Sequence, residues 1–510
     1  MRARQPSPRR APDGTLGAME PPFRPVLRFL DPALLERIVA EARTVLCTIG
    51  VEVHNPGVLA LLGDHGATIR AADRRAVLTE DLIDRALKTA PSGFRLYDAP
   101  GRAAYDLSGH NVHFTPGSAA IRVLPHDASA SRPPTTADVV AFTKLVAQLG
   151  NIAFQSTAIV PGDVPRNISD SYRLFLGLLH GDKPVVTGAF TVDAFNVMRD
   201  LQVAVRGSSQ ALREKPLTVF SCCPTAPLKW SDVTSQNVVD CARAGIPVEY
   251  ISMPLAGFVG PVTVVGSLVQ HTAETLSGVV ISQLATAGAP ALWGGSPASF
   301  DIRYETTPMG AVETTLLDCG ANEIGKYLRL PTQAYQGLSD AKLLDAQAGL
   351  ETAMGAILAA LGGVNSISGP GMLDFESSFS LEKLVVDNEI CGIALRAVRG
   401  IEARDDFPAV PILEELLREK HLLIADHTRK HLKAEHYFPG PVIDRANRSR
   451  WQAEGSRTLG ERAHGEVERL VAAWRPPALP DDVRAELTRL MRAEARRYGM
   501  DALPHESPPR

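Results

Sequence analysis

Aromatic side chains are the most informative chemical feature of this chain. Six of them stand in or just after short apolar runs, at Phe190, Phe220, Tyr250, Trp293, Phe300 and Tyr335. The face of an aromatic ring attracts a desolvated cation, and quaternary ammonium groups are typical guests. If the runs are strands that end at one face, these rings predict a pocket for an organic cation. Packing in an ordinary core is the competing interpretation.

Other reactive groups are sparse near the ends of these runs. Five carboxylates could line a cavity, although each could equally form a salt bridge or cap a helix: Glu249, Glu274, Glu313, Asp340 and Asp345. No Gly-x-Ser-x-Gly elbow is present, and Lys183 precedes its apolar run, which is the wrong end for catalysis. Covalent catalysis by a side chain therefore has little support.

Cysteine and histidine do not form a recognisable metal motif. Cys222 and Cys223 are adjacent, so on a strand they point to opposite faces, and buried structural thiols are the favoured interpretation. "HTRKHLKAEH" places His427 and His431 four residues apart but lacks the glutamate that follows the first histidine of a zinc protease. We therefore predict no metal site.

The apolar runs predict the framework that positions these groups. There are eight, each followed by a longer amphipathic stretch, at residues 121–127, 151–163, 183–190, 216–224, 247–254, 289–297, 331–337 and 364–371. From residue 151 onward they begin 31 to 42 residues apart, about the length of a βαβ unit. Near-continuous apolar strands alternating with helices predict a (β/α)8 TIM barrel. An open doubly wound sheet is less favoured, because no Gly-rich dinucleotide fingerprint follows a strand.

The flanking segments differ from the barrel in composition. We predict a disordered leader at 1–25, an N-terminal helical cap at 26–110, the barrel at 111–374, a C-terminal helical region at 375–498 and a loose tail at 499–510. In the cap, Asp31 and Pro32 predict the N-cap and first residue of a helix, and a second helix is expected near residues 81–89.

Composition excludes several classes of function. The chain has 510 residues, 45% hydrophobic and 22% charged, with a formal net charge of −4, which gives no basis for binding nucleic acid. No apolar stretch is long enough to span a membrane, and six scattered cysteines suit reduced thiols in the cytoplasm. A small molecule or a protein is the expected partner, and a homo-oligomer is compatible with these features.

Several motifs, taken in order over roughly residues 30 to 475, resemble those of the trimethylamine methyltransferase family. They are "ARTVLCTIGVEVHNPGVLALLGDHGA", "TTADVVAFTKLVAQLGNIAF", "DKPVV", "AGIPVEY", "GPVTVVGSLVQHTAETLSGVVISQLATAGAPALWG", "GLSDAKLLDAQAGLET" and "DHTRKHLKAEHYFP". The resemblance implies a (β/α)8 methyltransferase that depends on a corrinoid (cobalamin). No Asp-x-His-x-x-Gly signature is present, so the resemblance implies that a separate carrier protein supplies the corrinoid and that this chain binds no cofactor directly.

Leu338 decides which branch of the family this chain resembles. In the founding members a pyrrolysine follows the glycine of the segment equivalent to "QGLSDAK", and leucine stands there in this chain. The resemblance therefore implies the non-pyrrolysine branch, which demethylates quaternary amines such as glycine betaine. One departure is Thr272, which replaces the usual asparagine of an Asn-Ala-Glu motif whose glutamate is kept as Glu274.

From this resemblance we expect three groups of site residues. Leu338, Ser339 and Asp340 are expected to shape the catalytic site. Tyr250, Trp293 and Tyr335 are expected to face the ammonium group, and Glu249, Glu274 or Gln347 to orient it. A zinc-dependent, thiol-directed methyltransferase that uses Cys222 or Cys223 is the alternative on the same fold. A barrel that binds betaines without catalysis is the alternative from another functional class.

Overall fold

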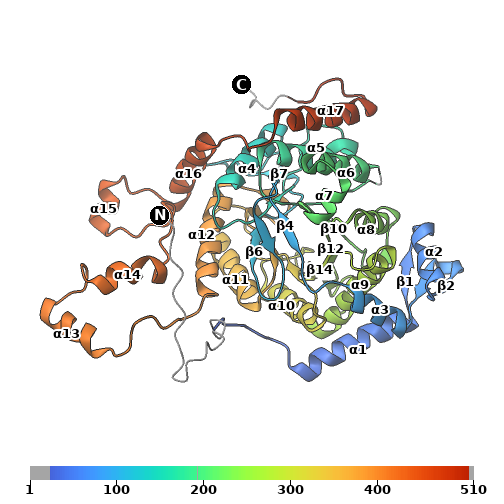
Figure 1. Cartoon of the computed structure of the whole chain (residues 1–510), viewed down its shortest axis with the longest axis horizontal. Helices are drawn as coiled ribbons and strands as arrows, with labels where there is room; N and C mark the ends of the chain where they lie inside the picture. The colour runs from blue at the N-terminus through green and yellow to red at the C-terminus, as the bar shows by residue number, and fades with distance from the viewer. Residues whose placement is uncertain (1–22, 192, 505–510) are drawn as a thin grey trace, which may run out of the picture.

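A closed ring of parallel strands forms the centre of the molecule (Figure 1). The computed structural model describes residues 23–191 and 193–504. Within these residues the ring has eight strands: β6 (His113–Thr115), β8 (Gln155–Ser156), β9 (Val185–Thr187), β10 (Thr218–Cys222), β12 (Val248–Ser252), β14 (Ala291–Gly295), β16 (Gln333–Ala334) and β17 (Ser366–Ser368). A parallel bridge between Trp293 and Thr332 joins β14 to β16, and the Ala153 N–H donates to the Phe114 carbonyl beside β6. The (β/α)8 barrel is confirmed.

A helix follows each strand and packs outside the ring (Figure 1). These helices are α4 (Thr136–Gln148), α5 (Arg166–His180), α6 (Ala194–Arg206), α8 (Asp232–Ala244), α9 (Val264–Ala285), α10 (Val312–Tyr327), α11 (Ala346–Gly362) and α12 (Leu381–Ala397), with a short α7 (Ser209–Glu214) after α6. The last of them, α12, packs between α11 and α16 (Leu459–Ala473). The helical ring therefore extends to residue 397, beyond the boundary predicted at 374.

The first predicted strand is wrong. Residues 121–127 contain only β7 (Arg122–Val123), which pairs with β19 (Ser378–Phe379) outside the ring, whereas the first barrel strand is β6. The register explains the error, because His113 and Thr115 share one face of β6 and Phe114 alone faces the other. A strand with two polar residues out of three is not recognisable as an apolar run.

The N-terminal segment is less helical than expected. Helix α1 (Pro32–Thr48) starts where predicted, with the Asp31 carboxylate accepting from the Ala33 and Leu34 N–H groups, and α3 (Glu80–Thr89) is also confirmed. However, β1 (Val51–Val53), β2 (Thr68–Arg70) and β3 (Arg75–Val77) form a sheet with β11 (Lys229–Trp230), next to α2 (Pro56–Asp64). Strands of three residues are too short to show an alternating pattern.

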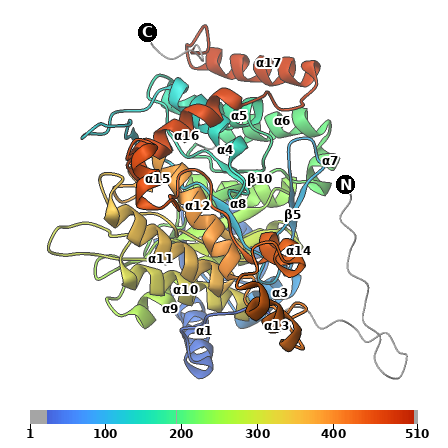
Figure 2. The same cartoon turned by 90° about the vertical axis from the view of Figure 1, so that its left-hand side faces the viewer.

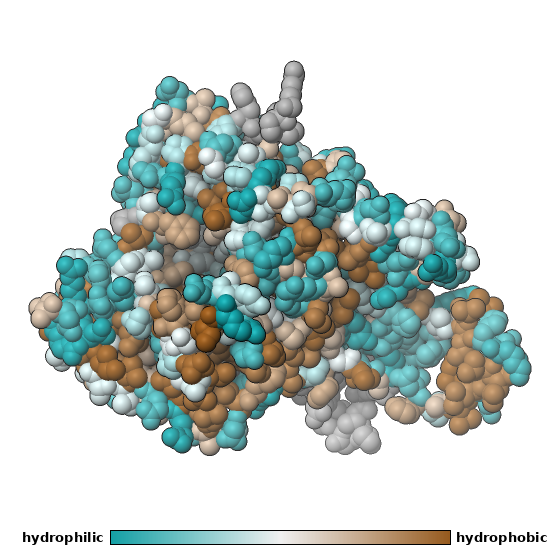
Figure 3. Space-filling view, turned by 180° about the vertical axis from the view of Figure 1, so that it is seen from behind, coloured by the Kyte–Doolittle hydropathy of each residue, from teal (hydrophilic) through white to brown (hydrophobic). Residues whose placement is uncertain are grey.

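Two satellite segments surround the barrel in the C-terminal part. Helices α16 and α17 (Asp481–Arg497) pack on α4, α5 and α6, whereas α13 (Val410–Glu419), α14 (Asp426–Glu435) and α15 (Arg448–Ala453) form an arm beside the barrel (Figures 1 and 2). None of the described side chains of these three arm helices is buried. Apolar residues gather on the arm (Figure 3), including Val410, Leu413, Leu417, Leu423 and Ile424. The predicted leader and tail lie mostly outside the described residues.

The barrel wall divides the hydrophobic core. Most buried apolar side chains pack between the strands and the outer helices. A separate cluster fills the amino-terminal half of the barrel interior with Phe154, Val186, Val219 and Leu292. Leu96 and Leu107, from the hairpin of β4 (Arg95–Tyr97) and β5 (Ala104–Asp106), join this cluster. Among the described helices, none combines the length and apolar character needed to cross a membrane.

Candidate active site at the carboxyl end of the barrel

Strand register determines which side chains face the barrel interior. Ser221 on β10 pairs with Glu249 on β12, and Glu249 pairs with Leu292 on β14, so these three share a face. Leu292 belongs to the interior cluster, which places Ser221 and Glu249 inside the barrel. The next pair along the same strands, Tyr250 and Trp293, therefore faces the outer helices. The interior side chains near the carboxyl ends of the strands are thus polar.

Several buried polar atoms in this half of the interior have no hydrogen-bond partner among the described residues. They are Glu249 Oε2, Gln333 Nε2, Thr115 Oγ1, Ser366 Oγ, Ser368 Oγ and Glu376 Oε1. The register places Gln333 opposite Ser366 and Thr115 opposite Ser368 on the same wall. Buried polar groups are normally hydrogen-bonded, so a cluster of unpaired ones indicates a place for a ligand or for water.

Glu249 is fully buried in this interior. One carboxylate oxygen accepts a hydrogen bond of 2.6 Å from the Ser221 hydroxyl, and the other lacks a partner among the described residues. Burial raises the pKa of Glu249 to about 7, although the Ser221 hydrogen bond acts in the opposite direction. A cation placed next to Glu249 would favour its charged form.

Glu376 is the functional candidate that sequence reasoning missed. It lies in the turn between β18 (Met372–Leu373) and β19, where Asp374, Phe375 and Glu376 have φ angles of 50°, 55° and 64°. Consecutive left-handed residues other than glycine are strained, and such strain is concentrated at functional sites. Burial, and then the charge of Asp340, raise the pKa of Glu376 to about 8. The only sign in the sequence is two acidic residues, Asp374 and Glu376, just beyond the last predicted strand.

Tyr335 lies close enough to both carboxylates for their charges to affect its pKa. Its hydroxyl is 2.9 Å from Ser118 Oγ, and its pKa is raised by burial and then by the charges of Glu249 and Glu376. It is the one predicted ammonium-facing residue that the structure brings into the interior. Its ring and the two carboxylates form the arrangement we call the cation cluster, defined as Glu249, Tyr335 and Glu376.

The predicted roles of Tyr250 and Trp293 are wrong. The Tyr250 hydroxyl donates to Ser282 Oγ of α9 at 2.6 Å, and Trp293 Nε1 donates to the Ala321 carbonyl of α10 at 3.0 Å. Both rings are therefore buried between the barrel wall and its helices. Because these strands are covered on both faces, hydrophobicity does not distinguish an inward ring from an outward one.

The segment around Leu338 is a structural support. Leu338, expected to shape the catalytic site, is only 2% exposed and belongs to the hydrophobic core. Ser339 Oγ donates to Glu351 at 2.6 Å, and the Asp340 carboxylate accepts from the Met309 and Gly310 N–H groups at 2.9 and 2.8 Å. Burial raises the pKa of Asp340 to about 6. These contacts fasten the loop after β16 to the loop before α10.

Glu274 and Gln347 also lie outside the interior. The Glu274 carboxylate accepts from Ser252 Oγ at 2.6 Å and from the Leu228 N–H at 2.9 Å, so it joins α9 to the end of β12 and to the loop before β11. Gln347 is exposed and donates to Glu351 Oε1 at 2.9 Å. Neither side chain is placed to orient a ligand next to Glu249.

An open cavity of about 660 Å³ lies at the carboxyl face, and we call it the mouth cavity. It is lined by residues 299–313 after β14, by the segment from Asp340 to Glu351 and by Phe375 of the β18–β19 turn. Phe375 thus lines the mouth cavity, while the neighbouring Glu376 has a carboxylate oxygen that is buried and has no partner among the described residues. Two of the predicted site residues, Asp340 and Gln347, line the mouth cavity.

The two adjacent thiols do not favour zinc-dependent thiol chemistry. Cys222 packs in the outer core, and both thiols lie close enough to Glu249 for that charge to affect them. Burial, and then Glu249, raise the pKa of Cys223 to about 12, and burial raises the pKa of Cys222. Zinc is bound by the thiolate form, which this environment disfavours.

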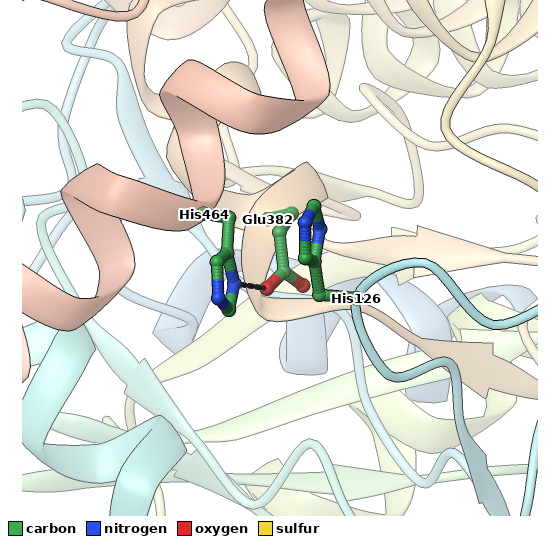
Figure 4. A group of neighbouring side chains, drawn as sticks. All are labelled: His126, Glu382 and His464. Carbon is green, nitrogen blue, oxygen red and sulfur yellow. Dashed lines mark hydrogen bonds and ion pairs between the residues drawn. The ribbon is translucent and has the colours of Figure 1, made fainter.

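A histidine and carboxylate cluster elsewhere ties the C-terminal helices to the barrel (Figure 4). His464 of α16 donates from Nδ1 to Glu382 of α12 at 2.9 Å, and its ring stacks on His126 with centroids 3.8 Å apart. These residue types could also bind a metal. The hydrogen bond and ring stacking already account for the arrangement as a polar contact between α16, α12 and the loop after β7.

Comparison with known proteins identifies the family. The family model described as "Trimethylamine methyltransferase (MTTB)" matches residues 2–499. This chain belongs to the trimethylamine methyltransferase family. It is 28% identical to a trimethylamine methyltransferase of Desulfitobacterium hafniense (strain DSM 10664 / DCB-2), covering 89% of this chain and 92% of that protein.

Other methyltransferases are also similar to this chain. A glycine betaine methyltransferase of Desulfitobacterium hafniense (strain Y51) is 28% identical over 91% of this chain and 96% of its own length. A trimethylamine methyltransferase of Methanosarcina barkeri is 30% identical over 83% of this chain and 86% of its own length. The solved monomethylamine methyltransferase of Methanosarcina barkeri aligns with a TM-score of 0.48 and 13% identity, covering 87% of this chain and 88% of that chain.

Proposed function

We propose that this protein transfers a methyl group from a quaternary amine, the class that includes glycine betaine, to the Co(I) corrinoid of a separate carrier protein. The observation that carries the proposal is the cation cluster. Glu249 and Glu376 are both close enough to Tyr335 to affect its pKa, and each has a buried carboxylate oxygen without a partner among the described residues. A quaternary ammonium group could pair with one of these carboxylates and contact the aromatic ring.

The chemistry of a quaternary nitrogen suits the residues present. When the N–CH3 bond breaks, nitrogen keeps the electron pair and leaves as a neutral tertiary amine, so no side chain must donate a proton. The corrinoid on its carrier would supply the electron pair that forms the new bond to the methyl group. The protein must bind the ammonium group, hold one methyl group in line and exclude water. An inert, buried Leu338 is compatible with this role.

The proposed carrier would dock at the mouth cavity. In (β/α)8 barrels the active site lies at the carboxyl ends of the strands, and the mouth cavity is the opening described at that end. The proposal includes no cofactor bound directly by this chain, and it places the reaction in the cytoplasm. The exposed apolar residues of the arm helices are suited to contact another protein or a second copy of the chain.

The direct test is methyl transfer to a carrier. The purified protein is mixed with a reduced corrinoid carrier and with glycine betaine, proline betaine, carnitine, choline or trimethylamine, and methylation of cobalt is followed by absorbance. We expect transfer from a quaternary amine and none from trimethylamine. Tight binding of a quaternary amine without transfer, using a carrier that is competent with another methyltransferase, would instead establish a non-catalytic binding protein.

A further inference from the structure

We infer that the substrate is a quaternary ammonium compound that carries no carboxylate. This inference rests on the proposed function and narrows it. Its basis is the charge of the groups that face the interior and the mouth cavity. These charges determine whether the substrate can carry a negative group in addition to its ammonium group.

The interior offers carboxylates and neutral groups to a ligand. Among the described strand side chains that the register turns toward its carboxyl half, Glu249 is acidic, while Gln333, Thr115, Ser366 and Ser368 are neutral and have unpaired atoms. Glu376, in the β18–β19 turn, adds a second carboxylate with a buried, unpaired oxygen. None of those described side chains is a lysine or an arginine. A carboxylate entering this space would therefore find no cation to pair with, and it would lie near two acidic groups.

The buried basic residues nearby are already engaged in the helical layer. Lys383 Nζ donates to Asp387 at 2.5 Å and to Thr352 at 2.9 Å, between α12 and α11. Arg173 donates to Asp170 at 2.8 Å within α5 and to the Thr157 carbonyl at 2.7 Å. Both side chains are almost completely buried, so neither is available to receive a substrate carboxylate.

The mouth cavity has the same charge preference. Among its described lining residues, the carboxylates are Asp301, Glu313, Asp340 and Glu351, and the bases are Arg303 and Lys342. Arg303 pairs with Asp301 at 2.6 Å, and Lys342 lies over the Phe375 ring at 3.8 Å and near Asp374 at 3.5 Å. The approach to the interior is therefore acidic, which attracts cations and repels anions.

The unpaired neutral groups indicate which polar group the substrate carries in place of a carboxylate. Gln333 Nε2 can donate a hydrogen bond, and the hydroxyls of Thr115, Ser366 and Ser368 can donate or accept one. An alcohol or amide on the substrate could satisfy these groups without bringing a charge. The expected substrate class is therefore a quaternary ammonium alcohol or amide.

A matched pair of ligands tests the inference. Glycine betaine and its neutral amide have nearly the same shape and differ in one negative charge. We expect isothermal titration calorimetry at pH 8 to show that the amide and choline bind at least about tenfold more tightly than glycine betaine. Equal or tighter binding of glycine betaine would overturn the inference, and methyl transfer from glycine betaine in the carrier assay would then leave the proposed function intact.

A variant separates charge selection from other causes. Glu249→Gln keeps the shape of the side chain and removes its negative charge. We expect the preference for betaine amide over glycine betaine to shrink by at least about threefold, while Glu214→Gln, a matched change on the exposed helix α7, leaves it unchanged. An unchanged preference in Glu249→Gln would refute the assignment of Glu249. Failure of every quaternary amine to bind or to donate a methyl group would refute the proposed function itself.

Discussion

The two halves of the barrel interior differ in what fills them. The amino-terminal half is packed with Phe154, Val186, Val219 and Leu292, and the β4–β5 hairpin contributes Leu96 and Leu107. The carboxyl-terminal half contains acidic, amide and hydroxyl groups, several without a partner among the described residues. Apolar side chains fill the first half, whereas the second half has buried polar groups that a ligand could hydrogen-bond or pair with.

A single strand contributes to both halves. On β10, Val219 belongs to the apolar cluster, and Ser221, two residues later on the same face, bonds Glu249. Side chains two positions apart on a strand point to the same face. Within one such step, β10 therefore changes from an apolar packing residue to a polar residue of the candidate site. The comparison predicts that substitutions in the first half affect stability, and that those in the second half affect ligand binding.

The largest effect is expected in the apolar half. Phe154→Ala removes a fully buried ring and leaves a cavity, so we expect a loss of about 3–5 kcal/mol in the free energy of unfolding, measured by guanidinium denaturation. The comparison variant is Ser366→Ala in the other half, which removes a hydroxyl without a described partner and is expected to cost less than about 0.5 kcal/mol. Similar losses in both variants would contradict the contrast.

A charge change in the polar half should affect binding more than stability. Glu376→Gln removes one carboxylate of the cation cluster, and we expect the affinity for choline to fall about 10- to 100-fold, or about 1.4–2.7 kcal/mol. The melting temperature at pH 8 should not fall, because the buried charge is unfavourable without a ligand. Calorimetry and thermal denaturation give the two values. A lower melting temperature with unchanged affinity would show that Glu376 has a structural role.

The pH dependence of binding should report the same carboxylates. Burial raises the pKa of Glu249 to about 7 and that of Glu376 to about 8, so both are mostly protonated at pH 6 and must ionise to hold a cation. We expect choline affinity to rise at least about tenfold between pH 6 and pH 9. In the double variant Glu249→Gln/Glu376→Gln, the choline affinity should not change with pH. An affinity that still rises with pH in that variant would show that other groups titrate.

The same shifts make the ligand-free protein less stable as pH rises. Above the ordinary pKa of glutamate the unfolded chain loses these protons, while the folded protein keeps them until about pH 7 to 8. The stabilising effect of the protonated groups is therefore complete below about pH 4.3 and is lost as pH rises through 8. Choline should restore part of the lost stability at pH 8.

The smallest effect is expected from a pair of tyrosines on opposite sides of the wall. Tyr250→Phe removes a buried hydrogen bond to Ser282 and should cost about 1 kcal/mol of stability without changing choline affinity. Tyr335→Phe removes the hydroxyl beside Ser118 and should mainly change affinity. Denaturation and calorimetry on both variants provide the check. Equal effects on affinity would place both rings at the ligand.

Much of the framework could be predicted from sequence. The repeated alternation of apolar runs and amphipathic stretches predicted the barrel, because strands buried on both faces leave a strong local pattern. The cap of α1 at Asp31 was also predictable, since the residue types that satisfy free N–H groups stand next to the helix. The family motifs reinforced the same interpretation.

The site was decided by tertiary structure. Glu249 and Tyr335 were among the predicted residues, but Tyr250 and Trp293 had the same appearance in sequence and face the outer helices. Glu376 stands in a strained turn beyond the last barrel strand, where one of its carboxylate oxygens is buried, and Leu338 is buried in the hydrophobic core. Hydrophobicity can show that a strand is buried on both faces, whereas only register and closure of the ring determine which face is the inside.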